Sequence, residues 1–266
     1  MHSDGPEKQY EPEPINTARL FAGRYRLHFS KIDSTNSFLL RNEHLLKIAG
    51  LVVTADSQTA GRGRKGRSWA DLAGDQLLAS VVLHPKISNF YLPSITLFVG
   101  LAVLKALTHI GCSPLAIKWP NDILLNKKKV CGILCELRSL PSGPVIVAGI
   151  GLNVNGSIEQ FPTSLRNRAS TLEAEQGLFF NKENILESLL SNLEEIMAEA
   201  HNGRITNLFR EWEAHSDSIG REVCFYHNNT LLKGTIKGLD KKGRLLVQVL
   251  ENDKETLLTT EEVEFV

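Results

Sequence analysis

The sequence lacks the cysteine pattern and the targeting segment that would mark a metal-binding or a secreted protein. Its four cysteines include no C-x-x-C pair, and residues 1–7 lack the basic-then-apolar plan of a signal peptide. We therefore expect reduced thiols and a cytoplasmic location. Cys131 and Cys135 lie four positions apart in an apolar run, which in a strand places both on one face. This spacing favours buried thiols over metal ligands, and we predict no metal site.

An excess of charge of either sign is also missing. Lysine and arginine together number 30, as do aspartate and glutamate, so no overall field draws the protein to nucleic acid or to an anionic membrane. The longest apolar stretch, residues 91–112, is interrupted by Pro93, Lys105 and His109. It is typical of a buried helix and not of a membrane span. We expect neither a nucleic-acid partner nor a membrane partner.

Residues 58–69 stand out against this balanced background. They read Gln-Thr-Ala-Gly-Arg-Gly-Arg-Lys-Gly-Arg-Ser-Trp, with three glycines and four positive charges. Glycine lets a backbone approach a ligand closely, while arginine and lysine neutralise phosphate or carboxylate groups. The segment is therefore either an anion-binding loop of an active site or a basic surface loop that binds nucleic acid.

Two segments resemble nucleotide-binding motifs but do not match them. Residues 61–68 nearly match the P-loop, but Arg67 replaces the required lysine, and a strand follows where a helix is needed. Residues 149–153 resemble the dinucleotide fingerprint, but Val154 stands where glycine is needed. We expect Gly149 and Gly151 to permit close backbone approach in the centre of a sheet or beside a ligand.

Hydrophobic periodicity predicts an α+β fold followed by a small β-barrel. After residue 216 the pattern changes to short strands with tight turns, which indicates the barrel. Residues 1–16 carry three prolines and little to bury, so we predict a flexible tail. The remaining expected elements are strands at 24–29, 51–55, 76–83, 130–137 and 145–154, and helices at 34–50, 93–110, 182–200 and 205–212.

Three further residues are candidates for ligand binding or catalysis, but each of them alone has a structural explanation as well. Ser34 is a good N-cap, and the first turn of the following helix offers backbone N–H groups to a ligand oxygen, although capping alone explains this serine. Lys118 ends a short strand before a turn, where a lysine is also explained as a solvent-facing charge. Asp122 in the same turn is either a general base or a turn-stabilising carboxylate.

Four blocks, taken in order, resemble the biotin protein ligases, the biotin-[acetyl-CoA-carboxylase] ligase family. They are residues 34–36, residues 58–67 with Trp69, residues 118–122, and residues 129–136 followed by 149–154. The resemblance covers about residues 20–266. It implies a catalytic domain of the biotin/lipoate ligase type at 17–215, with helices packed on a mixed β-sheet, and an SH3-like domain at 216–266.

The resemblance also implies an activity. Biotin and ATP would form biotinyl-5′-AMP with Mg²⁺ present, and a lysine of a biotin carboxyl carrier protein would then accept the biotin. Regulatory members carry an additional N-terminal DNA-binding domain; because only about 20 residues precede the first expected strand, we expect no repressor activity. Family members are monomers or homodimers. The alternatives are a lipoate–protein ligase of the same fold and a module that binds single-stranded nucleic acid through the basic loop and Trp69.

Residue roles follow from the same resemblance. Lys118 and Arg64 are the predicted catalytic residues, with Lys118 on the α-phosphate oxygens. Trp69 would stack on adenine, Asn153 would read the adenine edge, and Gly132 would leave room for backbone contact with biotin. The complete predicted binding set is Ser34, Thr35, Asn36, Gln58, Gly61, Arg62, Gly63, Arg64, Arg67, Trp69, Lys118, Gly132 and Asn153.

Overall fold

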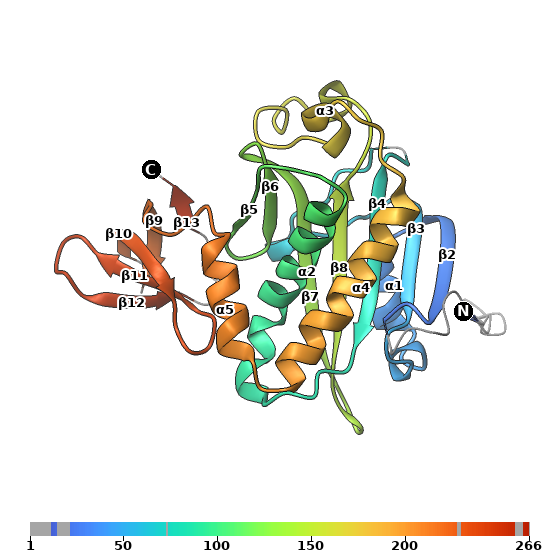
Figure 1. Cartoon of the computed structure of the whole chain (residues 1–266), viewed down its shortest axis with the longest axis horizontal. Coiled ribbons are helices and arrows are strands. Elements are labelled where there is room, and N and C mark those ends of the chain that lie inside the picture. Colours follow the sequence, from blue (N-terminus) through green and yellow to red (C-terminus); the bar gives the residue numbers. More distant parts are fainter. Residues whose placement is uncertain (1–11, 15–21, 73, 228–229, 259–262, 266) are drawn as a thin grey trace, which may run out of the picture.

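The computed structural model describes residues 12–14, 22–72, 74–227, 230–258 and 263–265. They form a large mixed sheet, a layer of helices against it, and a smaller sheet at the C-terminal end (Figure 1). The large sheet has the strand order β1-β2-β3-β4-β8-β7-β6-β5, in which only β2 and β3 are parallel. Its strands are β1 (Glu13–Pro14), β2 (Tyr25–Ile32), β3 (Val52–Gln58), β4 (Gln76–Leu83), β5 (Leu115–Lys118), β6 (Asp122–Leu125), β7 (Lys128–Leu140) and β8 (Gly143–Asn153).

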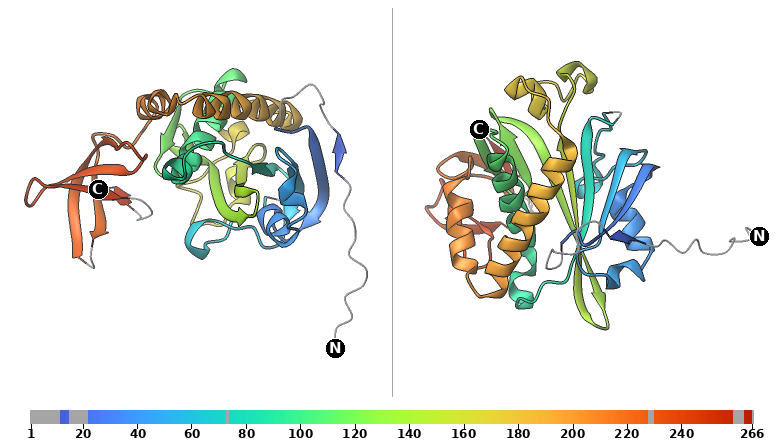
Figure 2. Two further views of the ribbon diagram at one scale, coloured as in Figure 1. Left: turned by 90° about the horizontal axis from the view of Figure 1, so that it is seen from below. Right: turned by 45° about the vertical axis from the view of Figure 1, so that its right-hand side comes forward.

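One face of the large sheet is covered by long helices. Helices α2 (Ile95–His109) and α4 (Lys182–His201) run side by side across it, and α5 (Ile205–Ala214) lies toward the small sheet (Figures 1 and 2). The buried residues of α4 recur every three to four positions, as expected of a helix with one apolar face. Asn181 caps α4 by accepting hydrogen bonds from the N–H groups of Glu183 and Asn184. The apolar repeat in the sequence therefore correctly predicts a helix at this position.

Helix α2 has a strongly apolar composition. Together with the preceding 3-10 helix η3 (Asn89–Ser94), it is long and apolar enough to cross a membrane by length and composition alone. However, 67% of that window is buried inside the structure. The helix packs against the sheet and the neighbouring helices, which agrees with the predicted buried helix.

The opposite face of the sheet is only partly filled. A second apolar cluster lies there, formed mainly by α1 (Thr35–Arg41), by η1 (Leu45–Lys47) and by strand residues such as Val145 and Val147. Because side chains alternate along a strand, Gly149 and Gly151 of β8 share this face with the two valines. The apolar filling therefore stops where the glycines begin, and a hollow remains.

The C-terminal strands form a five-stranded antiparallel sheet, consistent with the predicted small SH3-like domain. Its order is β12-β11-β10-β9-β13. Phe225 and Leu245 of this sheet belong to the same apolar cluster as α2 and α5, and Ser94 Oγ donates a 2.7 Å hydrogen bond to Lys242 O. The strands are β9 (Glu222–His227), β10 (Thr230–Leu239), β11 (Leu245–Val249), β12 (Glu255–Leu258) and β13 (Val263–Phe265).

Two expected segments differ from the structure. The helix expected at 34–50 ends at Arg41, because Asn42 turns away and its Nδ2 donates to Phe38 O, and η1 follows. Within the expected tail, Glu13–Pro14 pairs with β2 as a short edge strand. Except for residue 12, the rest of that tail lies outside the described residues.

Candidate functional site

A cavity of about 240 Å³ opens on the α1 side of the large sheet. It is bounded by the start of α1, by the segment between β3 and β4, and by the middle of β7 and β8. All of the predicted binding residues line it except Gly61 and Lys118. The predicted residues in its lining are Ser34, Thr35, Asn36, Gln58, Arg62, Gly63, Arg64, Arg67, Trp69, Gly132 and Asn153.

Glycines form the floor of the cavity, and Trp69 lies directly on them. A Cβ atom would lie 2.7 Å from the Trp69 ring at Gly132 and 2.6 Å from it at Gly151, closer than real Cβ contacts allow. The prediction that Gly151 permits a close approach to its backbone is therefore confirmed, because the Trp69 ring lies against it. Trp69 Nε1 is buried without a hydrogen-bond partner among the described residues.

Polar side chains close one end of the cavity. Gln58 Oε1 accepts hydrogen bonds from Thr35 N at 2.8 Å and from Thr35 Oγ1 at 3.2 Å. Ser80 Oγ on β4 lies 2.7 Å from Thr35 Oγ1 and 2.6 Å from Asn36 Oδ1. Ser34 caps α1 by accepting from Ser37 N. These neutral donors and acceptors suit an uncharged polar group of a ligand.

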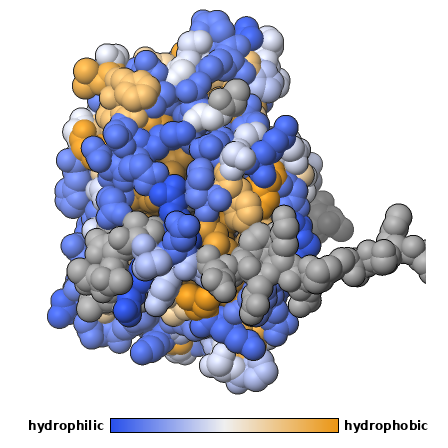
Figure 3. Space-filling model, turned by 90° about the vertical axis from the view of Figure 1, so that its right-hand side faces the viewer, coloured by the Kyte–Doolittle hydropathy of each residue, from blue (hydrophilic) through white to orange (hydrophobic). Residues whose placement is uncertain are grey.

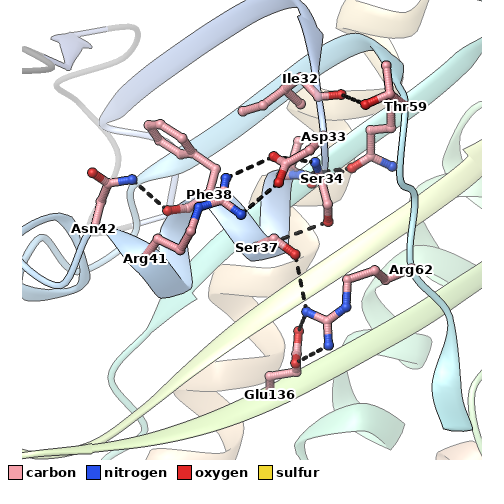
Figure 4. Close-up of polar contacts among 12 residues, drawn as sticks. Ile32, Asp33, Ser34, Ser37, Phe38, Arg41, Asn42, Thr59, Arg62 and Glu136 are labelled. Carbon is pink, nitrogen blue, oxygen red and sulfur yellow. Dashed lines mark hydrogen bonds and ion pairs between the residues drawn. The ribbon is translucent and has the colours of Figure 1, made fainter. Parts of the chain in front are cut away.

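Positive charge gathers at the mouth of the cavity. Arg62 forms a two-point ion pair with Glu136 on β7, and its Nη1 also donates to Ser37 Oγ at 3.3 Å (Figure 4). Arg64 Nη1 lies 3.5 Å from Asn121 Oδ1. Arg64 and Arg67 also line the cavity, so three guanidinium groups lie around it, and such groups stabilise anions.

The basic segment is folded back on itself between β3 and β4, in the strand-to-strand context that excluded a P-loop. Trp69 N donates to Gly61 O at 2.9 Å, and Gly63 N donates to Arg67 O at 2.7 Å. A Cβ atom on Gly61 would lie 2.8 Å from Trp69 O, so this glycine serves the closed loop. Gly66 has a positive φ of 74°, which favours glycine at the tip.

Lys118 and Lys129 occupy different places. Lys118 ends β5 opposite Asp122, is half-buried and does not line the cavity. Burial lowers its pKa, as do the positive charges of Arg221 and Lys129, whereas Asp122 opposes the shift. Lys129 does line the cavity; its Nζ lies 2.7 Å from Asp122 Oδ1 and 5.5 Å from the centroid of the Trp69 ring.

Sequence reasoning missed several residues of this site. Ser80, Glu136 and Lys129 all contact the predicted set, and Gln76 Nε2 donates to Asn153 Oδ1 at 2.9 Å. The sequence marks these residues only weakly. Ser80 and Gln76 are polar positions in a mostly apolar strand. Lys129 and Glu136 lie in the block 129–136 that resembles the family, but the resemblance assigns them no role. Only a contact across the sheet identifies them.

The cysteines and acidic groups offer no metal centre within the described residues. They contain no group of three or more His, Cys, Asp or Glu side chains that could hold a metal ion. All four cysteines are free. Burial raises the pKa of Cys112 to about 11 and that of Cys135 to about 12, and it raises the pKa of the fully buried Cys131 as well. The prediction of buried thiols is confirmed for Cys131, and Cys135 is half-buried.

The mixed sheet and its helical layer form a fold that is also found in known ligases. The chain belongs to the biotin/lipoate A/B protein ligase family, which matches residues 29–155. More particularly, it is 33% identical over 224 residues to a biotin-[acetyl-CoA-carboxylase] ligase of Mycobacterium tuberculosis, covering 81% of this chain and 80% of that protein. The ligase of the same name from Paracoccus denitrificans is 30% identical over 230 residues, covering 82% and 92%.

The chain is also similar to a longer bifunctional protein and to a solved ligase structure. The chain is 32% identical to the bifunctional ligase/repressor BirA of Bacillus spizizenii over 206 residues, which are 77% of this chain and 63% of that protein. It thus spans less than two thirds of that relative. The structure of a biotin protein ligase from Aquifex aeolicus in complex with biotin and ATP superposes with a TM-score of 0.76 at 30% identity, covering 91% of this chain and 99% of the other.

Proposed function

We propose that the protein activates biotin with ATP and transfers it to a lysine of a biotin carboxyl carrier protein. The biotin carboxylate would attack the α-phosphorus of ATP, giving biotinyl-5′-AMP and releasing pyrophosphate. The lysine amine would then attack the carbonyl carbon of the mixed anhydride, forming an amide and releasing AMP and a proton. The observation that carries this proposal is one cavity with neutral polar groups at one end and guanidinium groups at its mouth.

The relatives support the choice of substrates. Those from Paracoccus denitrificans and Mycobacterium tuberculosis are named as biotin-[acetyl-CoA-carboxylase] ligases, and the Aquifex structure holds biotin and ATP. In this chain, Thr35 and Gln58 present donors and acceptors suited to the urea group of biotin. The apolar ring and chain of biotin would lie against Trp69, which covers Gly132 and Gly151.

Charge stabilisation falls to the basic groups at the mouth. Joining a carboxylate to a triphosphate brings two anions together, so fixed cations and N–H donors lower the barrier. Arg62 and Arg64 line the cavity and would hold the carboxylate and phosphates. Lys129 reaches the cavity directly, and we add it to Lys118 as a candidate for the α-phosphate oxygens. Trp69 would stack on adenine.

Mg²⁺ enters this proposal as part of the substrate, bound to ATP. The described residues hold no cluster of ligating side chains, and Asp122 and Glu136 are engaged by Lys129 and Arg62. Phosphate oxygens and water would therefore supply the coordination, as is usual for magnesium with nucleotides. The bound ion would reduce the negative charge that the attacking carboxylate meets.

The proposal also includes the location of the protein and its partners. We place the protein in the cytoplasm, and we assign it no nucleic-acid or membrane partner. Figure 3 shows hydrophilic side chains over most of the described part of one face, with apolar ones gathered in smaller areas between them. A homodimer through another face stays compatible with the proposal. Asp122 is committed to its ion pair, so we assign no general base.

The test is a comparison of acids with purified protein. Pyrophosphate release is measured with ATP, Mg²⁺ and either biotin or lipoate, followed by transfer of labelled acid to a carrier domain. The proposal expects release with biotin and label on one carrier lysine. Release with lipoate alone would replace it by the lipoate ligase, whereas salt-sensitive binding to single strands without release would favour the nucleic-acid module.

A further inference from the structure

One carboxylate beside the cavity has no role in the reaction described above. Glu136 Oε1 lies 2.9 Å from Arg62 Nη2, and its Oε2 lies 3.1 Å from Arg62 Nη1 (Figure 4). Asn36 Nδ2 donates to the same Oε2 at 2.9 Å. A negative charge next to a site for anions repels the anions. Its presence there therefore requires another explanation. The contacts of Glu136 indicate what that explanation is.

We propose that Glu136 is a positioning residue that fixes Arg62, so that the remaining edge of the guanidinium meets an oxyanion in the cavity. The oxyanion is a carboxylate or a phosphate, the two groups that arginine binds in the same forked geometry. This inference rests on the proposed function. It adds to it a residue that touches no substrate but sets the place of one that does.

The geometry of Arg62 leaves a binding edge available. Glu136 occupies the Nη1–Nη2 edge, and Ser37 Oγ takes a further hydrogen of Nη1. The other edge consists of Nε–H and the second N–H of Nη2, and neither of these two hydrogens has a partner within the described part of the chain. Since Arg62 lines the cavity, a ligand can be bound there without release of Glu136.

Fixing the guanidinium beforehand favours binding. The Arg62 side chain is 43% exposed, and an arginine of that exposure loses rotamer freedom when it binds a ligand. A partner that holds it in one rotamer removes part of this entropic cost before the ligand arrives. The Glu136 side chain is 20% exposed, so its own position is better defined.

The Asn36 amide that holds Glu136 is itself fixed by further contacts. Besides Glu136, Asn36 Nδ2 donates to Leu134 O at 3.0 Å, and Asn36 Oδ1 lies 2.6 Å from Ser80 Oγ. A Cβ atom on Gly149 would lie 2.3 Å from Asn36 Oδ1, so only glycine leaves room for this amide. Helix α1 and the basic loop therefore meet at the Glu136 carboxylate, and the Asn36 amide that holds it is fixed by contacts with β4 and β7, in space that Gly149 of β8 leaves open.

The chain offers a matched control. Arg26 forms a two-point pair with Glu183 at 2.7 and 3.0 Å, and neither residue lines the cavity. Glu183→Gln and Glu136→Gln make the same chemical change, removing one charge with little change of shape. Affinities for biotin, biotin methyl ester, ATP and adenosine are measured by calorimetry for wild type and both variants.

We expect Glu136→Gln to weaken binding of the anionic member of at least one pair about tenfold, with less than about twofold change for its neutral counterpart. A loss confined to biotin assigns the edge to the carboxylate, and one confined to ATP assigns it to phosphate. Glu183→Gln should change neither. In an Arg62→Ala background, Glu136→Gln should cause no further loss, because the residue it positions is gone.

Three results would overturn the proposal. Equal losses for charged and neutral ligands would make Glu136 a structural residue only, and unchanged affinities would leave it without a role. Tighter binding of the anion would mean that Glu136 competes with the ligand for Arg62. Each of these requires a wild type that binds biotin and ATP. A wild type that binds neither would instead overturn the proposed function, and this inference with it.

Discussion

Gly149→Ala is a substitution whose cost can be worked out from single contacts. The added methyl group would lie 2.3 Å from Asn36 Oδ1 and 2.8 Å from Asn36 Cγ. Gly149 does not have a positive φ, so the backbone itself accepts alanine and the clash is the whole penalty. Asn36 cannot rotate away freely, because its amide contacts Leu134, Glu136 and Ser80.

The two contributions are of similar size. Overpacking of a well-packed site costs about 1–3 kcal/mol, and each hydrogen bond lost by a displaced amide costs about 1 kcal/mol. We expect the free energy of unfolding to fall by about 2–4 kcal/mol when both act. At about 2–4 °C per kcal/mol for a protein of this size, the melting temperature should drop by about 5–15 °C.

The assay is thermal unfolding, with one control variant and one double-mutant cycle that combines Gly149→Ala with Asn36→Ala. In Gly100→Ala the new methyl group in α2 has its nearest neighbour at 3.8 Å, so this variant should melt at or above the wild-type temperature. In an Asn36→Ala background, Gly149→Ala should lose most of its cost, because the clashing amide is absent. An equal drop in both backgrounds would refute the reasoning, since the penalty would then come from elsewhere.

Four further predictions concern charge and exposure. Lys129→Ala should reduce pyrophosphate release at least as much as Lys118→Ala, because Lys129 lines the cavity; full activity of either variant in that assay would remove its phosphate role. Arg64→Gly should release the adenylate faster in a filter-retention assay, and an unchanged rate would count against the covering loop. Burial lowers the pKa of Lys118 below 10.5, and a lysine is charged only below its pKa. Adenylation should therefore decline at a lower pH than an ordinary lysine would give, and Lys118→Arg should move that decline upward. Cys131 should resist iodoacetamide in the native protein, as mass spectrometry would show, because its thiol is buried and its pKa is raised.

The elements that the sequence predicts well are those whose pattern is local. Helix α4 follows from its apolar repeat and from Asn181 at its start, and β8 follows from an apolar run with glycines. The first helix was expected to continue to residue 50 because its apolar residues continue. It ends at Arg41 because the side chain of Asn42 takes up a carbonyl of the last turn, a local competition that periodicity does not register.

The site was predictable only where a motif could be recognised, and its packing was not. Gly149 and Gly151 are explained by Asn36 and Trp69, which lie far away in the sequence and meet them only across the sheet. Ser80 is a polar residue in a mostly apolar strand, but the strand sequence does not show that its partner is Asn36. The residue types indicate the chemistry of the cavity, whereas the pairing of the strands determines which residues line it.

Lys129 shows why alternation alone fails at this site. In a regular strand it would share a face with Cys131, which lies in the core on the helix side. The register between β6 and β7 shifts at Ile123/Leu124, so that Leu124 pairs with Lys129 and Val130 has no opposite residue. Val130 and Cys131 are consequently both buried in the helix-side core, and Lys129 lines the cavity together with Gly132. A bulge of this kind redirects one side chain without changing the strand pattern, and here it brings a positive charge beside Trp69.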